Sequence, residues 1–372
     1  MMKRLFLGIG IALALSGVAQ AGDALAVDMF RHVVAQEEGN VVFSPASAEA
    51  VLHMLREGAA GQTKAELAAL PYGKQGVPSA MQVESANALF AADDLELKEL
   101  GVKDIHRVPF AAAPKKAADE VNAWCSEKTH ERISSIVSPT DIRPDTRLIA
   151  INAVYLKEQW LRPFESHRTQ PRPFTAANGT VTQVPTMAQK AGFRYAEGED
   201  WQAVALFYRA QGREGEPGCF IGIRPRGDAR EFIGKLDAKR WESIRSALNK
   251  AAQEPTVVEL PRFRVETPVF KLNHALQALG VRTAFTGQAD FSGFTDEPLR
   301  LSEVRQRCFV QVDETGTEAA AVTAAIMMKN ALPRRDPPPH IIRFDKPFLW
   351  VITDLSTDAP PYFMGLMEEV RS

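Results

Sequence analysis

The chain has little cysteine and almost no excess charge, and each shortage excludes a class of protein. Its 372 residues contain three cysteines, too few for a small disulfide-rich scaffold. Basic and acidic residues nearly balance, with 44 Lys and Arg against 46 Asp and Glu and a formal net charge of −2. Such a balance provides no broad basic face, which argues against nucleic acid as the main partner.

Long apolar runs are also missing, and the one short run lies at the N-terminus. Uncharged apolar residues extend from Leu5 to about Leu15, about half the length that a helix needs to span a bilayer. The run follows a basic start, Met1 to Arg4, and precedes the small-residue site Ala19-Gln20-Ala21, which is the order of a secretory signal peptide. We therefore predict a signal peptide over residues 1–21. The short basic region favours a bacterial protein in the periplasm or outside the cell, with a eukaryotic secretory route as the alternative.

Signatures of catalysis and of metal binding are absent as well. The sequence has no Gly-x-Ser-x-Gly, Ser-x-x-Lys or His-Glu-x-x-His pattern, and no glycine-rich loop suited to a phosphate. No Cys and His cluster has the spacing of a metal site. Cys125 and His130 are poorly placed on a helix to act together as nucleophile and base. We predict neither an enzyme nor a bound cofactor or metal.

The three cysteines, Cys125, Cys219 and Cys308, each lie among apolar residues. Free cysteine behaves as a small hydrophobic residue in protein cores, so we predict three buried thiols. One disulfide with a leftover thiol is the alternative for an exported chain.

What the chain has in abundance is apolar residues, which are 45% of the sequence and enough for a large core. Strands and helices are mixed without regular βαβ alternation, and no linker or repeat divides the chain, so we predict one α+β domain over residues 22–372. The predicted helices cover residues 24–35, 45–57, 115–133, 228–248 and 269–279. The predicted strands cover residues 40–43, 148–156, 204–208, 219–223, 256–260 and 309–312.

The strand over residues 148–156 is apolar without alternation, as expected of a central strand covered on both faces. Asn152 is its one strongly polar residue, so its side chain must find hydrogen-bond partners inside the core. In the preceding part of the chain, Ser44-Pro45 supplies a capping hydroxyl followed by a proline suited to the first helical position.

Two stretches near the C-terminus have unusual composition. Residues 316–325 are almost all small, and composition alone would favour a helix there. Residues 330–340 hold four prolines and two arginines, so they must form exposed loop.

Several motifs, in their order along the chain, resemble those of the serpin family. The matching segments are Asn40 to Ser47, Gly58 to Thr63, Val121 to Trp124, Asn152 to Lys157, Leu260 to Phe263, Ala289 to Gly293, Asp313 to Ala321 and Phe344 to Phe348. The resemblance implies an α+β serpin fold with three β-sheets, eight or nine helices and an exposed reactive loop near residues 316–336.

The resemblance also implies a function. A target endopeptidase, of the serine or the cysteine class, would cleave the reactive loop, and the cut loop would insert into the main sheet before the acyl-enzyme hydrolyses. The protease would stay covalently trapped on a monomeric inhibitor. The alternative is a non-inhibitory serpin that acts as a carrier, a chaperone-like protein or a plain protease substrate.

Insertion places strict demands on the hinge of the loop. By resemblance the hinge comprises Glu314, Gly316, Thr317, Glu318, Ala319, Ala320 and Ala321. Alternate residues of an inserted strand must enter the core. The inward set would be Thr317, Ala319, Ala321, Thr323, Ala325 and Met327, and none of these is charged or proline, which favours an inhibitor over a substrate.

The bond that the protease cleaves is less narrowly defined. The family's usual distance from Gly316 places it at Asn330-Ala331 or, one residue earlier, at Lys329-Asn330. The loop is longer than usual toward its C-terminal side, which makes Arg334 and Arg335 rival sites. Lys329 suits a trypsin-like pocket, and Met328 or Asn330 suits other pockets.

Two further groups match sites that control insertion in the family. Ser44, Ser47 and Asn152 match the shutter, a polar network under the main sheet, in which Gln306 replaces the usual histidine. A glutamine amide can still donate and accept. Trp160, Arg262 and Glu314 match the breach, where the loop enters the sheet. Arg262 and Glu314 are candidates for a bidentate pair, or are two unrelated surface charges.

Overall fold

The computed structural model describes residues 21–73, 81, 83–99, 104–210, 212, 217–266, 269–317, 338–356 and 359–370. Residues 1–20 of the predicted signal peptide and residues 318–336 of the predicted reactive loop therefore lie outside the described residues. The described part has seven α-helices, which are α1 (Ala21–Gln36), α2 (Pro45–Gly58), α3 (Gly61–Ala68), α4 (Pro114–Lys128), α5 (Ala229–Gly234), α6 (Ala238–Lys250) and α7 (Asn273–Ala278). None of these helices is long and apolar enough to cross a membrane.

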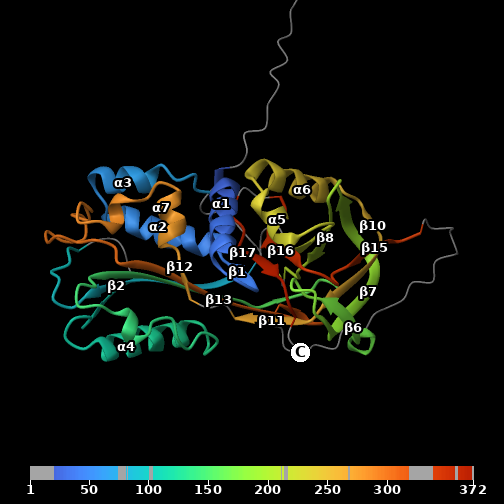
Figure 1. Cartoon of the computed structure of the whole chain (residues 1–372), viewed down its shortest axis with the longest axis horizontal. Helices are drawn as coiled ribbons and strands as arrows, with labels where there is room; N and C mark the ends of the chain where they lie inside the picture. The colour runs from blue at the N-terminus through green and yellow to red at the C-terminus, as the bar shows by residue number, and fades with distance from the viewer. Residues whose placement is uncertain are drawn as a thin grey trace, which may run out of the picture.

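The main sheet contains the strands that position the candidate site (Figure 1). Its order is β3 (Ile105–Val108), β2 (Val83–Ala92), β4 (Leu148–Leu156), β13 (Glu303–Val312), β14 (Gly316–Thr317) and β5 (Glu158–Gln159). The strands β11 (Phe263–Glu266) and β12 (Phe270–Lys271) also pair with β13. β4 and β13 run parallel at its centre, with Glu303 opposite Ile149 and Phe309 opposite Tyr155.

A second sheet is formed by the remaining strands. Its order is β1 (Val41–Phe43), β17 (Phe363–Met367), β16 (Phe348–Thr353), β9 (Cys219–Pro225), β8 (Trp201–Phe207), β7 (Val181–Glu197), β10 (Gln253–Pro261) and β15 (His340–Arg343), with β6 (Gln170–Thr175) paired to β7. The fold is α+β, as predicted. Two hydrogen-bonded sheets are observed where three were expected. The long strand β7 pairs with β10 over one part and with β8 over its end, which joins strands of two expected sheets into one.

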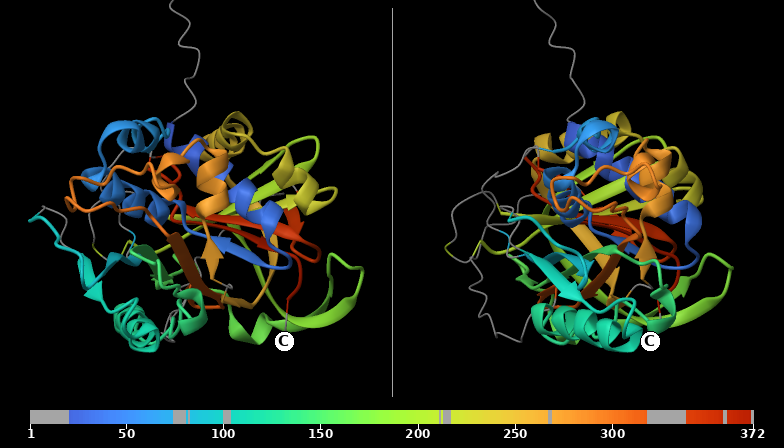
Figure 2. Two further views of the ribbon diagram at one scale, coloured as in Figure 1. Left: turned by 60° about the vertical axis from the view of Figure 1, so that its left-hand side comes forward. Right: turned by 90° about the vertical axis from the view of Figure 1, so that its left-hand side faces the viewer.

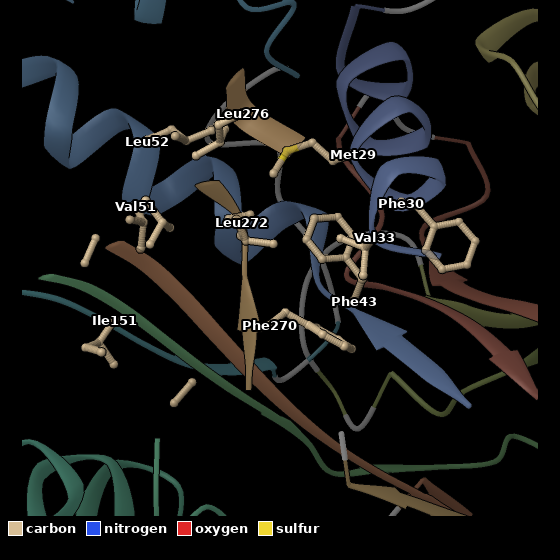
Figure 3. Close-up of a cluster of buried hydrophobic side chains, with 14 of the residues drawn as sticks. Met29, Phe30, Val33, Phe43, Val51, Leu52, Ile151, Phe270, Leu272 and Leu276 are labelled. Atoms are coloured by element: carbon tan, nitrogen blue, oxygen red, sulfur yellow. The ribbon is translucent and has the colours of Figure 1, made fainter. Parts of the chain in front are cut away.

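Helices cover both faces of the main sheet (Figures 1 and 2). α2 packs on β2 and β4 from one side, and α4 packs on β2 from the other. All nine residues of β4 are buried, which confirms the prediction of a strand covered on both faces. Figure 3 shows the side chains that fill the space beside α1 and α2, namely Met29, Phe30, Val33, Val51 and Leu52 together with Phe43, Phe270, Leu272 and Leu276.

The predicted start of α2 is confirmed. The Ser44 hydroxyl accepts the N–H of Ser47 at 3.4 Å, and Pro45 occupies the first turn. The three buried thiols are also confirmed, because Cys125, Cys219 and Cys308 are all free and buried, and the alternative of a disulfide is wrong.

Three predicted helices differ from the observed ones. The helix expected over residues 115–133 ends at Lys128, because His130 and Glu131 take φ of +47° and +62°, which a helix cannot continue through. The helix expected over residues 228–248 is two helices, because the Asp237 carboxylate accepts the Arg240 N–H at 2.7 Å and starts α6 anew.

The helix expected over residues 269–279 is shortened to α7, because Phe270 and Lys271 pair with β13 as strand β12. Fewer helices are seen in the described residues than the eight or nine expected. In the connections from α3 to β2 and from β2 to β3, the described residues contain no helix.

One buried acid in this fold has a strongly shifted titration. Glu49, on α2, is fully buried, and its Oε2 accepts the N–H of Gly73 at 3.1 Å. Burial raises the pKa of Glu49 from 4.5 to about 7; the nearby charge of Asp23 raises the pKa further, and the Gly73 hydrogen bond opposes the rise. The folded protein therefore holds a proton on Glu49 that the unfolded chain releases as the pH rises past 4.5.

We predict that Glu49→Gln removes a pH-dependent loss of stability. In the parent protein the contribution of Glu49 is most favourable below pH 4.5 and is lost as the pH rises toward 7, by on the order of 3 kcal/mol. The neutral amide should make the variant more stable than the parent at pH 8 and nearly equal to it at pH 4.5, as measured by urea unfolding. The exposed Glu57→Gln on the same helix is the control. A variant less stable than the parent at pH 8 would contradict the prediction.

Candidate functional site

The candidate site lies along the seam between β4 and β13, the two parallel strands at the centre of the main sheet. A polar network crosses the middle of the seam, and a short strand from the start of the reactive loop occupies its end. Each part is built from residues that are far apart along the chain.

The middle of the seam is joined by the side chain of Gln306. Gln306 on β13 lies directly opposite Asn152 on β4. Its Nε2 donates to Asn152 Oδ1 at 2.6 Å and to the carbonyl oxygen of Ser44 at 2.9 Å, while its Oε1 accepts the Ser44 N–H at 2.9 Å. All three residues are almost completely buried. The amide thus links the two central strands to the start of α2.

The network continues from Asn152 onto a third strand. Asn152 Nδ2 donates to Ser47 Oγ and to Asn87 Oδ1, and Ser47 Oγ donates to Asn87 Oδ1 at 2.9 Å. The structure therefore brings together all four residues that the sequence assigned to the shutter, Ser44, Ser47, Asn152 and Gln306. Sequence reasoning missed Asn87 on β2, which lies opposite Asn152. The sequence pattern that could have identified Asn87 is the one that identified Asn152, a single amide side chain flanked by apolar residues.

The far end of the seam holds Gly316 and Thr317, the first two residues of the predicted reactive loop. Thr317 pairs with Val312 of β13, and Gly316 and Thr317 pair with β5, so strand β14 lies between them. A Cβ at Gly316 would lie 2.0 Å from the carbonyl oxygen of Glu158, which leaves room only for glycine. Thr317 is fully buried, and its hydroxyl hydrogen-bonds the hydroxyl of Tyr208 at 2.7 Å.

A tight turn connects β13 to this short strand. Asp313 Oδ1 accepts the N–H of Thr315 at 2.8 Å, the hydroxyl of Thr315 at 2.6 Å and the N–H of Gly316 at 3.3 Å. The N–H of Asp313 donates to the carbonyl oxygen of Gly316 at 2.9 Å. These bonds fix the direction in which the chain leaves the turn.

Trp160 secures the turn from the side of β5. Its indole Nε1 donates to the carbonyl oxygen of Asp313 at 2.8 Å, and its backbone N–H donates to that of Thr315 at 2.9 Å. The indole also stacks on Tyr208, with ring centroids 4.7 Å apart. Tyr208 was missed by sequence reasoning, and nothing in its local sequence marks it.

The other two predicted breach residues meet less closely than expected. Arg262 Nη1 lies 3.7 Å from Glu314 Oε2, which makes an ion pair but not the bidentate pair that was a candidate. The nearer partner of Glu314 is Thr169, whose hydroxyl donates to Oε1 at 2.6 Å. Thr169 thus bonds one carboxylate oxygen of Glu314, and the half-exposed Arg262 lies 3.7 Å from the other.

The remaining candidate residues lie outside the described residues, and their roles stay predictions. They are Glu318, Ala319, Ala320 and Ala321 of the hinge, the inward residues Thr323, Ala325 and Met327, and the reactive-bond candidates Met328, Lys329, Asn330, Ala331, Arg334 and Arg335.

No other arrangement in the described residues suggests catalysis. Burial raises the pKa of the Cys125 thiol to about 12, so it is not a reactive thiolate, and His130 contacts Glu84 at 2.5 Å. Across the described ranges, no three His, Cys, Asp or Glu side chains are placed to hold a metal ion.

Comparisons with known proteins give one consistent result. A family model described as Serpin (serine protease inhibitor) matches residues 20–369. A serpin-like protein of Thermococcus kodakarensis is 35% identical, over 94% of this chain and 85% of its own length. Iripin-2 of Ixodes ricinus is 30% identical, over 95% of this chain and 94% of its own length.

Solved structures agree with these relatives. The crystal structure of native protease nexin-1 with heparin superposes with a TM-score of 0.78 at 27% identity, covering 94% of this chain and 98% of that one. The native thermophilic serpin tengpin superposes with a TM-score of 0.80 over 95% of this chain and 94% of its own, and at 24% identity it shows the fold alone.

We predict that Gln306→Ala weakens the closed seam. The substitution leaves Asn152 Oδ1 and the Ser44 N–H without their partner in the core, at a cost of about 1–3 kcal/mol for each buried group. The melting temperature should fall, and a loop-inserted or polymeric form should appear at a lower temperature on native gels. Gln306→His should also shift that temperature, by changing the same contacts. Gln311→Ala, at a less buried position of the same strand, is the control. Equal thermal behaviour of parent and both Gln306 variants would show that the network does not hold the seam.

Proposed function

Because the chain belongs to the serpin family, whose members generally inhibit proteases, we propose that it inhibits serine endopeptidases as a suicide substrate. The protease would cleave the reactive loop and remain as a covalent acyl-enzyme. The loop would then enter the main sheet between β4 and β13. In this proposal the protein is an inhibitor and not a catalyst, and the predicted signal peptide would bring it to the periplasm or outside the cell.

The observation that carries the proposal is the position of Gly316 and Thr317. They form a strand between β13 and β5, and β5 follows β4 directly along the chain. Extending this short strand by further loop residues would push β4 and β13 apart and fill the space between them. The start of the loop is therefore already directed into the seam that insertion must open.

Insertion is favourable only if the new strand can be paired and buried. Each inserted residue can bond to both neighbouring strands, whereas before insertion the facing edges of β4 and β13 bond to each other in a single ladder. The gain is one additional ladder of hydrogen bonds and the burial of small side chains. Residues 317–327 contain one charged residue, Glu318, which alternation directs away from the core.

We predict that Thr317→Arg converts the inhibitor into a substrate. Thr317 is already fully buried against Tyr208, and an unpaired charge there costs several kcal/mol, so an arginine should expel β14 from the seam. The loop then loses its paired start, and insertion must bury the charge again. Each 1.4 kcal/mol added to the insertion barrier slows insertion about tenfold, whereas hydrolysis of the acyl-enzyme is unaffected. Incubation with a trypsin-like protease should give the cleaved variant and free protease, while the parent gives a complex that survives boiling in detergent.

Glu318→Arg is the control for this experiment, because the neighbouring side chain points the other way in a strand and the variant should still trap protease. If the parent itself forms no stable complex with any serine protease tested, the inhibitory proposal fails and a carrier or plain substrate is favoured. If Thr317→Arg traps protease as well as the parent, the loop does not insert in the proposed register.

A further prediction concerns the cleaved bond. Lys329→Ala should impair inhibition of trypsin-like proteases more than Arg335→Ala, because only Lys329 lies near the family's usual distance from Gly316. The check is the rate of inhibition of both variants, together with the mass of the C-terminal fragment released from the complex. The reverse order of effects would place the bond in the longer, C-terminal part of the loop.

A further inference from the structure

A segment between α4 and β4 crosses the main sheet on the face opposite to the Gln306 network. We call this segment, residues 129–142, the strap. Near its start, His130 Nε2 contacts Glu84 Oε2 of β2 at 2.5 Å, and the His130 ring lies 6.2 Å from that of Tyr155 on β4. Farther on, the Arg132 guanidinium lies over Phe309 of β13 at 6.0 Å. The strap thus passes over β2, β4 and β13 in turn.

Two arginines of β13 hold the strap at the far side of the seam. Arg307 Nη1 donates to the carbonyl oxygen of Ser135, and Arg305 Nη1 donates to that of Ile136 at 3.0 Å. Arg305 Nη1 also contacts Asp141 Oδ2 at 2.8 Å, and only 2% of the Arg305 side chain is exposed. Both arginines alternate along the strand with Gln306, so they project from the opposite face.

The same part of the strap is fixed to α4 on the near side of the seam. Asn122 Oδ1 accepts the N–H groups of Ile136 and Val137 at 2.8 and 3.0 Å, and Asn122 Nδ2 donates to the carbonyl oxygen of Val137 at 2.8 Å. α4 is in turn packed on β2 through Trp124, whose ring meets that of Phe90 edge-on at 5.5 Å. The strap therefore joins β2 to β13 across the seam.

We propose that Arg305 and Arg307 act as positioning residues that clamp the strap over the seam and so set how fast the main sheet opens for the loop. This inference rests on the proposed function. A strand added between β4 and β13 moves β13 away from β4 by about 4.8 Å, beyond the range of any of these hydrogen bonds. The arginine contacts must break, or the strap must leave α4, before insertion is complete.

The two faces of the seam would then be held in different ways. The Gln306 network is closed inside the core, whereas the clamp joins charged groups of β13 to a segment that lies on the outer face of the sheet. Asp141 is the acid that the strap contributes to the clamp, because its Oδ2 lies 2.8 Å from Arg305 Nη1, and this hydrogen bond lowers the pKa of Asp141. Glu303, on β13 itself, pairs with the same guanidinium at 2.5 Å and moves with it. Weakening the clamp should speed opening without changing the residues that enter the seam.

The test uses an acetylated peptide that copies residues 317–328, added to the intact protein in the absence of protease. Its incorporation into the sheet is followed by native gel and by the rise in melting temperature. Asp141→Asn keeps an acceptor for the Ser138 N–H but removes the strap's charge from Arg305, which stays paired with Glu303 of its own strand. Arg307→Ala removes the contact to Ser135 together with an ion pair to Glu266 of β11. Each variant should take up the peptide about tenfold faster than the parent, which corresponds to a barrier lower by about 1.4 kcal/mol.

Two controls separate a clamp from a general loss of stability. Arg224→Ala removes a comparably buried arginine that pairs with Asp345 in the second sheet, and it should take up the peptide at the parental rate. Arg307→Lys keeps a charged donor and should restore most of the parental rate. With a protease that the parent traps, Arg307→Ala should also release a smaller fraction as cleaved product.

Peptide uptake at the parental rate in both Asp141→Asn and Arg307→Ala would overturn the clamp, and so would equal acceleration in Arg224→Ala. Because uptake requires no protease, a parent protein that traps no protease would contradict the proposed function alone. Uptake by the variants but not by the parent would be the strongest result in favour of the clamp.

Discussion

The parallel pairing of β4 with β13 is the interaction on which the rest of the structure depends. These strands lie at the centre of the main sheet, with α2 packed on one face and α4 on the other. Their seven paired residues must be stable enough to keep the native protein closed, yet they are the contacts that loop insertion would replace. The groups that surround the seam can be understood as ways of meeting both requirements.

Polar groups suit the middle of such a seam better than apolar ones. A buried network is stable when every member is bonded and costly when one partner is lost. Gln306, Asn152 and Ser44 satisfy one another across the closed seam, so partial opening is penalised. An apolar seam of the same shape would hold the strands by burial alone, and it would not penalise a slip of register in the same way.

At the end of the seam, the path of the chain is set mainly by close backbone contacts and by hydrogen bonds to the backbone. The close approach of Gly316 to the carbonyl of Glu158 admits no side chain, and the Asp313 turn and the Trp160 indole orient the backbone that follows. The loop thus leaves β13 already paired as a strand. In the proposed function this arrangement spares the loop a nucleation step, because the first residue pair of the new strand exists before cleavage.

Local sequence determined a large part of this protein. The run of apolar residues around Asn152 predicted β4 as a central strand, Ser44-Pro45 predicted the start of α2, and the ordered motifs indicated the family. Each of these signals depends on residues that are close together along the chain. The single amide side chain of Asn152 in this run predicted a buried polar network, although the sequence did not show all of its partners. The same local reasoning failed at Phe270 and Lys271, where pairing with β13 overrides the helical pattern.

Only the tertiary structure decided which distant residues complete the site. The partners in these contacts lie between 65 and 172 residues apart along the chain. They are Asn87 with Asn152, Tyr208 with Thr317, and Arg305 and Arg307 with the strap. Nothing in the neighbouring sequence of Tyr208 distinguishes it from any other buried aromatic residue. Its role arises because folding places its hydroxyl beside Thr317, and such a meeting is set by the packing of whole strands and not by the local pattern of either segment.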